Sequence, residues 1–127
     1  MSKVLIVKLI MYYSAIYGFD GNTALAVAKT ESGLNPNAIG LANEVGIFQL
    51  KPQYVTEYTR AELFDPVNNI KAGIKRLKET KRQCVHKQGN SYLVCYNMGT
   101  SAAKRIRHPN LFPYVKKVNA LIAMENL

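Results

Sequence analysis

The segment Ala24-Leu25-Ala26-Val27-Ala28-Lys29-Thr30-Glu31-Ser32-Gly33 predicts an amphipathic helix that ends with an acid on its apolar side. Ala24, Val27, Ala28 and Glu31 follow the i, i+3, i+4, i+7 spacing of one helical face. Asp20 is a suitable N-cap, and Gly33 is a suitable stop. We therefore expect a helix from Asp20 to Ser32 with Glu31 in its last turn.

Two physical effects act on a carboxyl group in that position. Burial disfavours its ionised form, and so does the negative end of the helix dipole. Both effects raise the pKa, and a carboxylic acid that stays protonated near neutral pH is the proton donor that glycosidic cleavage requires. The alternative is that Glu31 sits at the rim of the core and reaches water.

The remaining sequence also has helical patterns, and no segment predicts a β-sheet. We expect one mainly α-helical domain over residues 1–127, with at most a minor β hairpin in the irregular stretch 34–45. The segment 46–50 is predicted to be short and buried. Predicted helices cover residues 3–17, 20–32, about 53–59, 66–87, 90–98, 101–107 and 110–124.

The helix that begins at Asp65-Pro66 is predicted to be amphipathic. Its opposite face is basic, and we expect that face to be solvated rather than to form a specific binding site. Tyr54 and Tyr58 are expected in the core or in a cleft wall. The inner stripe of the helix is Ile70, Gly73, Ile74 and Leu77, and the basic face is Lys71, Lys75, Lys78 and Arg82.

The net charge of +9 is concentrated in the second half of the chain. Residues 1–65 have a balance of −1, and residues 66–127 have a balance of +10. This charge predicts electrostatic contact with a polyanion such as the bacterial envelope. We do not expect specific nucleic-acid binding, because the basic face lacks interleaved aromatic residues and the chain has no recognisable nucleic-acid-binding module.

The N-terminal segment Lys3–Tyr17 is predicted to be a buried first helix that ends at Gly18. Its apolar run is interrupted by Lys8 and is too short to span a bilayer. No cleavage site of the small-x-small type follows before Asp20, so we expect no Sec signal here. The chain is then expected to be delivered by a bacteriophage (virion or lysis enzyme) or to be a processed product.

Cys84 and Cys95 flank a predicted turn at Gly89-Asn90. Two buried thiols are the default expectation, and a disulfide across an antiparallel helix hairpin is the alternative. Neither cysteine has metal-ligand spacing with His86 or His108, so no metal site is predicted.

Five motifs in the same order give the chain a resemblance to the soluble lytic transglycosylases, a family with the lysozyme-like fold. The resemblance runs from the first helix to Val118. The motifs are Glu31-Ser32-Gly33-Leu34-Asn35-Pro36-Asn37-Ala38, Gly46-Ile47-Phe48-Gln49-Leu50, Asp65-Pro66 with Asn69-Ile70 and Gly73, Cys95-Tyr96-Asn97-Met98-Gly99, and Tyr114-Val115-Lys116-Lys117-Val118.

The resemblance implies cleavage of peptidoglycan between N-acetylmuramic acid and N-acetylglucosamine, with no cofactor. Glu31 would protonate the scissile oxygen and then accept the proton of the muramyl C6 hydroxyl, which would leave a 1,6-anhydro sugar. Ser32 would support the site, Gln49 and Asn97 would hydrogen-bond the sugar, Tyr96 would shape the cleft, and Tyr114 would orient Glu31. Alternatively, Gln49, Tyr96 and Tyr114 satisfy buried backbone groups.

The number of carboxylates separates two mechanisms. A hydrolytic glycosidase usually has a second carboxylate about 5–9.5 Å from the acid. Glu44 is the sole carboxylate between Glu31 and Gln49, which favours the non-hydrolytic reaction. Gly40, Phe48 and Cys95 depart from the Ser, Met and Ala common in the family, which bears on the shape of the subsites and not on the class of reaction.

Two other functions remain open beside the transglycosylase. One is a hydrolytic muramidase on the same fold, and the other is a catalytically silent basic protein that binds the wall. We expect the protein to be a monomer and to act at the periplasmic cell wall, with peptidoglycan glycan strands as its partner.

Overall fold

The computed structural model describes residues 1–125, which contain helices and connecting loops but no β-strand. Two isolated antiparallel bridges, Ile39–Val45 and Val45–Leu50, take the place of the predicted minor hairpin. The mainly α-helical class is confirmed. The elements are α1 (Lys3–Tyr17), α2 (Gly21–Ser32), η1 (Pro52–Tyr54), α3 (Arg60–Leu63), α4 (Pro66–Gln83), α5 (Leu93–Met98), α6 (Thr100–Ala103), η2 (Pro109–Leu111) and α7 (Pro113–Glu125).

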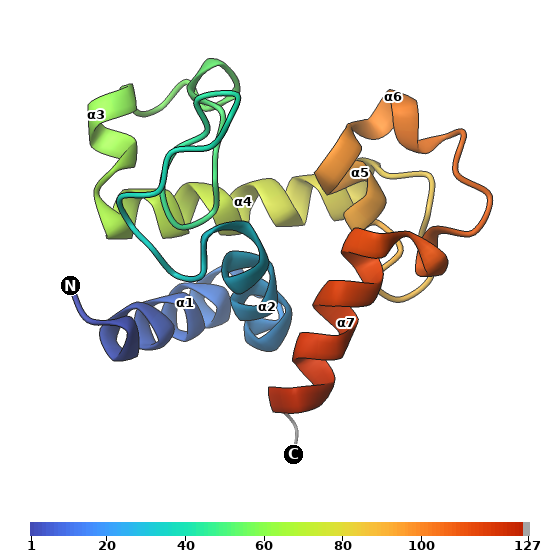
Figure 1. Ribbon diagram of the computed structural model, residues 1–127, viewed down its shortest axis with the longest axis horizontal. Helices are drawn as coiled ribbons and strands as arrows, with labels where there is room; N and C mark the ends of the chain where they lie inside the picture. Colours follow the sequence, from blue (N-terminus) through green and yellow to red (C-terminus); the bar gives the residue numbers. More distant parts are fainter. Residues whose placement is uncertain (126–127) are drawn as a thin grey trace. The chain divides into compact units, whose positions relative to one another are not determined.

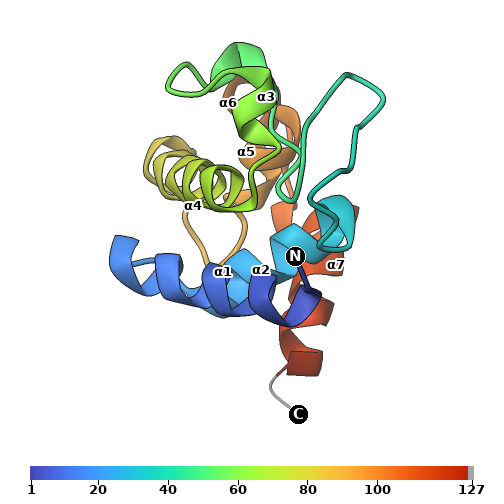
Figure 2. The ribbon, with the colours of Figure 1, turned by 90° about the vertical axis from the view of Figure 1, so that its left-hand side faces the viewer.

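The chain forms two compact units, Met1–Lys75 and a second unit that begins at Arg76. In the first unit, α1 and α2 lie on one side of the N-terminal half of α4 (Figure 1). The long loop after α2 and the short helix α3 lie on the other side, as the view turned by 90° also shows (Figure 2). Side chains of this half of α4 contact α1 through Lys71 and the loop through Asn69.

Helix α1 has the predicted bounds but not the predicted burial. Ser2 caps its start by accepting a hydrogen bond from the backbone N–H of Leu5, and Gly18 ends it in the left-handed conformation at φ 68°. Of its residues only Ile6, Ile10 and Ser14 are buried. The prediction of a buried first helix was wrong for its outer face, where Val4, Leu5, Tyr12 and Ile16 are exposed, because α1 is apolar on every side and packs through one.

Helix α2 agrees with its prediction at both ends. The carboxylate of Asp20 accepts hydrogen bonds from the backbone N–H and the hydroxyl of Thr23, and Gly33 closes the helix at φ 63°. The segment from Thr23 to Ala28 is buried throughout. The helix that carries Glu31 is thus fixed by caps at its ends and by apolar packing along its length.

The predicted helix at about 53–59 does not form. Instead, the 3-10 turn η1 follows Lys51, and α3 begins after Thr59. Thr59 and Glu62 form a capping box, because the Thr59 side chain accepts from the Glu62 backbone and the Glu62 side chain accepts from the Thr59 backbone. Tyr54 is 65% exposed, so the expectation of a core position for it was wrong.

Helix α4 confirms its predicted inner stripe, because Ile70, Ile74 and Leu77 are fully buried. Its basic face is not simply solvated within the first unit. The Lys71 ammonium lies 5.8 Å from the ring centroid of Tyr13, and that of Lys75 lies 5.5 Å from that of Tyr17. These cation–π contacts attach α4 to the aromatic side of α1.

In the second unit, a disulfide joins Cys84 to Cys95, with the Cα atoms 6.0 Å apart. The default expectation of two thiols was therefore wrong. Helix α4 ends at Gln83 rather than near Lys87, whose ammonium donates instead to the carbonyls of Lys81 and Arg82. Lys87 thus satisfies carbonyls at the end of the helix instead of extending it.

Among the remaining helices of the second unit, α5 contacts both α6 and α7. Helix α6 stops at Ala103 instead of Arg107, and the Ala103 carbonyl lies 2.8 Å from Nε2 of His86. Cationic side chains cover two buried rings of this unit: Arg76 lies over Tyr96 at 5.4 Å, and Lys81 lies over Tyr92 at 5.6 Å. Part of the basic charge of this half therefore has a packing role.

Within residues 1–125, no helix combines the length and the apolar character that crossing a bilayer demands. The same residues contain no cluster of three or more His, Cys, Asp or Glu side chains suited to hold a metal ion.

We predict that removing the disulfide lowers the free energy of unfolding by about 3 kcal/mol, the chain-entropy value for a loop of this size. The loop joins residues 11 positions apart. The measurement is urea unfolding of wild type and of the double variant Cys84→Ala/Cys95→Ala, each with and without a thiol reductant. Reductant should weaken the wild type to the level of the variant and leave the variant unchanged. A wild type whose free energy of unfolding is the same with and without reductant contradicts the prediction.

Candidate active site

Glu31 lies in the last turn of α2, where its side chain is neither fully buried nor fully exposed. The helical face that leads to Glu31 is buried, because Ala24, Val27 and Ala28 have no exposed surface. The backbone N–H of Gly33 donates to the Lys29 carbonyl and closes the helix directly after Ser32. Glu31 therefore stands where apolar packing meets the negative end of the helix dipole.

Ser32 connects this helix end to the loop 45–50. Its hydroxyl donates to the carbonyl of Ile47 at 2.7 Å and accepts from the backbone N–H of Asn35 at 3.2 Å. The two contacts fix the chain on either side of the turn that follows Glu31. The structure thus ties Ser32, the neighbour of Glu31, to the loop, whereas the supporting role that the family resemblance implies for Ser32 stays a prediction.

Asn69 holds the same loop from the side of α4. Its Nδ2 donates to the carbonyls of Val45 and Leu63, each at 2.9 Å, and its Oδ1 accepts from the backbone N–H of Phe48 at 2.8 Å. The side chain is only 1% exposed, so three buried backbone groups depend on one amide. Sequence reasoning placed Asn69 in a motif but did not identify this role.

Two glycines make that approach of loop and helix possible. Gly46 has φ 77°, and a Cβ atom there would collide with the Nδ2 of Asn69. Gly73 on α4 leaves room for the ring of Phe48, which a Cβ atom would strike. The departure of Phe48 from the usual family residue is therefore accommodated by close packing on α4.

The side-chain amide of Gln49 hydrogen-bonds to backbone carbonyls of its own loop. Its Nε2 donates to the carbonyls of Ala38 at 3.1 Å and Gly46 at 2.9 Å, and its backbone adopts φ 49°. Both N–H groups of the amide have partners, so the Oε1 atom is the part that remains suited to accept a hydrogen bond from a sugar hydroxyl. The alternative that Gln49 satisfies backbone groups is thus also present in the structure.

Glu44 folds back onto its own loop. Its Oε1 accepts from the backbone N–H of Ala42 at 2.7 Å. A Cβ atom on Gly40 would lie 2.5 Å from that oxygen and 2.6 Å from Oε1 of Gln49. A side chain at position 40, where many family members have serine, would therefore displace the carboxylate of Glu44 or the amide of Gln49.

The other three predicted site residues belong to the second unit. Tyr96 and Asn97 are neighbours on α5, and Tyr114 is the second residue of α7. Tyr96 is 6% exposed and lies under Arg76, whereas Asn97 is exposed and Tyr114 is intermediate. Asn97 is accessible to a ligand, and Tyr96 is chiefly a packing residue within its unit.

An acid at the end of a helix, beside a loop that a buried amide holds, is an arrangement suited to a proton donor in a domain that cleaves carbohydrate. The chain belongs to the transglycosylase SLT domain family, whose model matches residues 8–110. Five of the six predicted site residues lie in the matched range. Tyr114 lies beyond it.

The chain is also similar to proteins that are named as transglycosylases. The chain is 30% identical over 116 residues to the membrane-bound lytic murein transglycosylase C of Mannheimia succiniciproducens, covering 78% of this chain and 32% of that protein. It is 29% identical over 126 residues to the protein of that name from Haemophilus influenzae, covering 83% of this chain and 34% of the relative. The chain thus spans about a third of the length of these relatives.

We predict that Asn69→Ala lowers the free energy of unfolding by about 3–5 kcal/mol, because it leaves three buried backbone groups without partners. The matched control is Asn68→Ala, whose side chain makes one exposed hydrogen bond, to the Glu62 carbonyl at 3.1 Å. That control should cost less than about 1 kcal/mol. Chemical denaturation of the two variants is the measurement, and equal losses would show that Asn69 does not hold the loop.

Proposed function

We propose that this chain is a peptidoglycan lytic transglycosylase that cleaves the β-1,4 bond between N-acetylmuramic acid and N-acetylglucosamine. The observation that carries the proposal is the position of Glu31, on a helix whose buried face leads to it and whose end Ser32 ties to Ile47 at 2.7 Å. Family membership supports the same reaction, since the chain matches the transglycosylase SLT domain over residues 8–110.

The proposed reaction uses one carboxyl group twice. Glu31 donates its proton to the glycosidic oxygen as the bond from that oxygen to C1 of the muramyl sugar breaks. The resulting carboxylate accepts the proton of the C6 hydroxyl, and O6 forms the new bond to C1. The glycan gains a 1,6-anhydro end, Glu31 regains its proton, and no water is consumed.

The local contacts of Glu44 favour this route over hydrolysis. A hydrolytic enzyme usually has a second carboxylate that activates water or attacks C1. Glu44 instead accepts a hydrogen bond from the Ala42 backbone and packs beside Gly40. Its carboxylate stabilises the loop, which leaves Glu31 as the reacting acid in the segment from α2 to Gln49.

The other predicted site residues have different roles in this proposal. Ser32 is a positioning residue, and Gln49 offers its Oε1 atom to the sugar. Asn97 is exposed on α5 and suits an acetamido group, since its amide donates and accepts. The roles of Tyr96 in shaping the cleft and of Tyr114 in steering the acid rest on the family resemblance alone.

The proposed place of action is the cell wall, with glycan strands as substrate. From Arg76 onward the chain has ten Lys and Arg residues against two acids, Glu79 and Glu125. That excess attracts the enzyme to anionic envelope polymers and weakens as salt is added. We further propose that the enzyme acts as a monomer and as a single domain over residues 1–127.

We predict that Glu31→Gln lowers the rate of peptidoglycan cleavage by about 10²–10⁴-fold, because the amide cannot transfer a proton. Unfolding midpoint and binding to intact wall should stay close to those of wild type. The measurement is mass spectrometry of soluble products from purified peptidoglycan, in which wild type should release anhydro-muramyl ends.

The matched control is Glu44→Gln, which keeps an oxygen for the Ala42 backbone and should retain most of the activity. Reducing muramic acid ends from the wild type would establish the hydrolytic muramidase in place of the transglycosylase. Undiminished cleavage by Glu31→Gln would remove Glu31 from catalysis. A wild type that binds wall without releasing products would be the silent wall-binding protein.

A further inference from the structure

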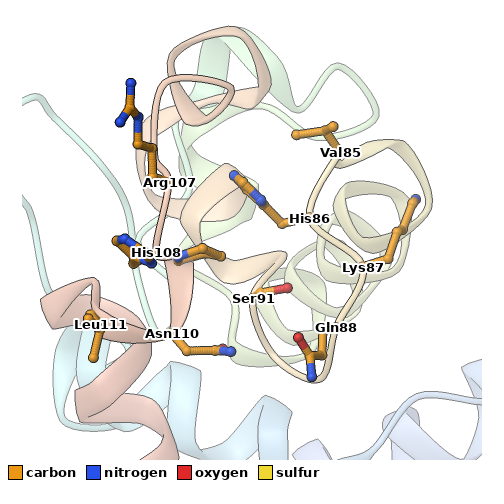
Figure 3. Close-up of a pocket in the computed structure, with 10 residues that line it drawn as sticks. Val85, His86, Lys87, Gln88, Ser91, Arg107, His108, Asn110 and Leu111 are labelled. Atoms are coloured by element: carbon orange, nitrogen blue, oxygen red, sulfur yellow. The ribbon is translucent and has the colours of Figure 1, made fainter.

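The second unit contains a pocket of about 400 Å³ between the segment that follows α4 and the segment that precedes α7. Figure 3 shows His86 extending from the first segment toward the second, and Asn110 extending in the opposing direction. None of the six predicted site residues lines it. The lining residues are Val85, His86, Lys87, Gln88, Ser91, Arg107, His108, Pro109, Asn110 and Leu111.

The lining of this pocket is rich in hydrogen-bond donors and has no carboxylate. Lys87 and Arg107 carry positive charge, two imidazoles add ring nitrogens, and Gln88 and Asn110 add amides. The unit around the pocket is strongly basic, with Glu79 and Glu125 as its two acids. Glu79 is ion-paired with Arg82. The local field therefore favours an anionic ligand.

The pocket also contains a buried hydroxyl that has no hydrogen-bond partner. Ser91 is 1% exposed, and its Oγ atom makes no hydrogen bond among the residues that the structure describes. Buried hydroxyls are nearly always paired, because an unpaired one costs free energy. An oxygen of a bound ligand would supply the missing partner.

The walls of the pocket are held before any ligand arrives. The Cys84–Cys95 disulfide closes the loop that carries five of the lining residues. Nε2 of His86 lies 2.8 Å from the Ala103 carbonyl, which fixes the ring and leaves Nδ1 for another partner. The ammonium of Lys87 is held by two carbonyls of α4. Arg107 is exposed at the rim, where its guanidinium is suited to a bidentate oxyanion.

We propose that this pocket is an oxyanion-binding site, which accepts a carboxylate or phosphate group of a wall polymer. The ligand oxygens are received by the Ser91 hydroxyl and the Asn110 amide, and the exposed Arg107 adds positive charge to the lining. The site provides a second attachment to the envelope, at residues other than those assigned to glycan cleavage. It does not depend on Glu31 being a catalytic acid.

The test is an NMR titration of the full chain, following the backbone amides of residues 85–91 and 107–111. Two probes separate the sources of the anion: inorganic phosphate, and N-acetyl-D-alanyl-D-alanine for a peptide carboxylate. We expect saturable chemical-shift changes that are confined to these segments with at least one probe. The probe that binds more tightly identifies the ligand group as a phosphate or a carboxylate. Absence of saturable shifts with both probes overturns the proposal.

Matched variants separate the site from diffuse attraction to a basic surface. Arg107→Gln should lower the affinity for the tighter-binding probe at least fivefold. Arg105 is an exposed residue nearby that does not line the pocket, so Arg105→Gln should change this affinity less than twofold. Equal effects of the two variants overturn the proposal. Ser91→Ala should weaken binding without lowering the unfolding midpoint. A change in the midpoint with unaltered affinity would assign Ser91 to folding and also overturn it.

Discussion

The first unit depends on one buried amide that satisfies three backbone groups at once. Asn69 accepts from Phe48 and donates to the carbonyls of Val45 and Leu63, so a loop without regular structure is fixed to a helix. A segment of this kind has few ladder hydrogen bonds of its own, and burying it without partners would be costly. Gly46 is the consequence, because the amide occupies the place that any Cβ atom would need.

That constraint extends to the candidate acid in short steps. The hydrogen bond that holds Phe48 also holds its neighbour Ile47, and the Ile47 carbonyl accepts a hydrogen bond from the Ser32 hydroxyl. Ser32 is adjacent to Glu31, so the position of the acid depends on α4 through hydrogen bonds as well as on α2 through apolar packing. The same loop explains why Glu44 is a stabilising group: its carboxylate is used on the Ala42 backbone, close to Gly40 and Gln49.

Much of this arrangement could be predicted from the sequence where local signals are strong. Asp20 and Gly33 predicted the two ends of α2, and Asp65-Pro66 predicted the start of α4, because capping residues act within one turn of the helix. Prediction failed where distant contacts decide the outcome. The exposed side of α1 follows from which neighbours it has, and α4 and α6 end early where Lys87 and His86 contact backbone carbonyls. The roles of Asn69 and Gly40 were missed because each depends on a partner brought near by folding.

The central claim is that the surroundings of Glu31 keep its carboxyl group protonated near the pH at which it works. It is tested most directly by following the side-chain carboxyl carbon of Glu31 by NMR while the pH is raised, with Glu31→Gln to assign the signal. The half-buried position of Glu31 and the negative end of the helix dipole predict a midpoint above the roughly 4.3 of an unperturbed glutamate. A midpoint at that ordinary value would contradict the account.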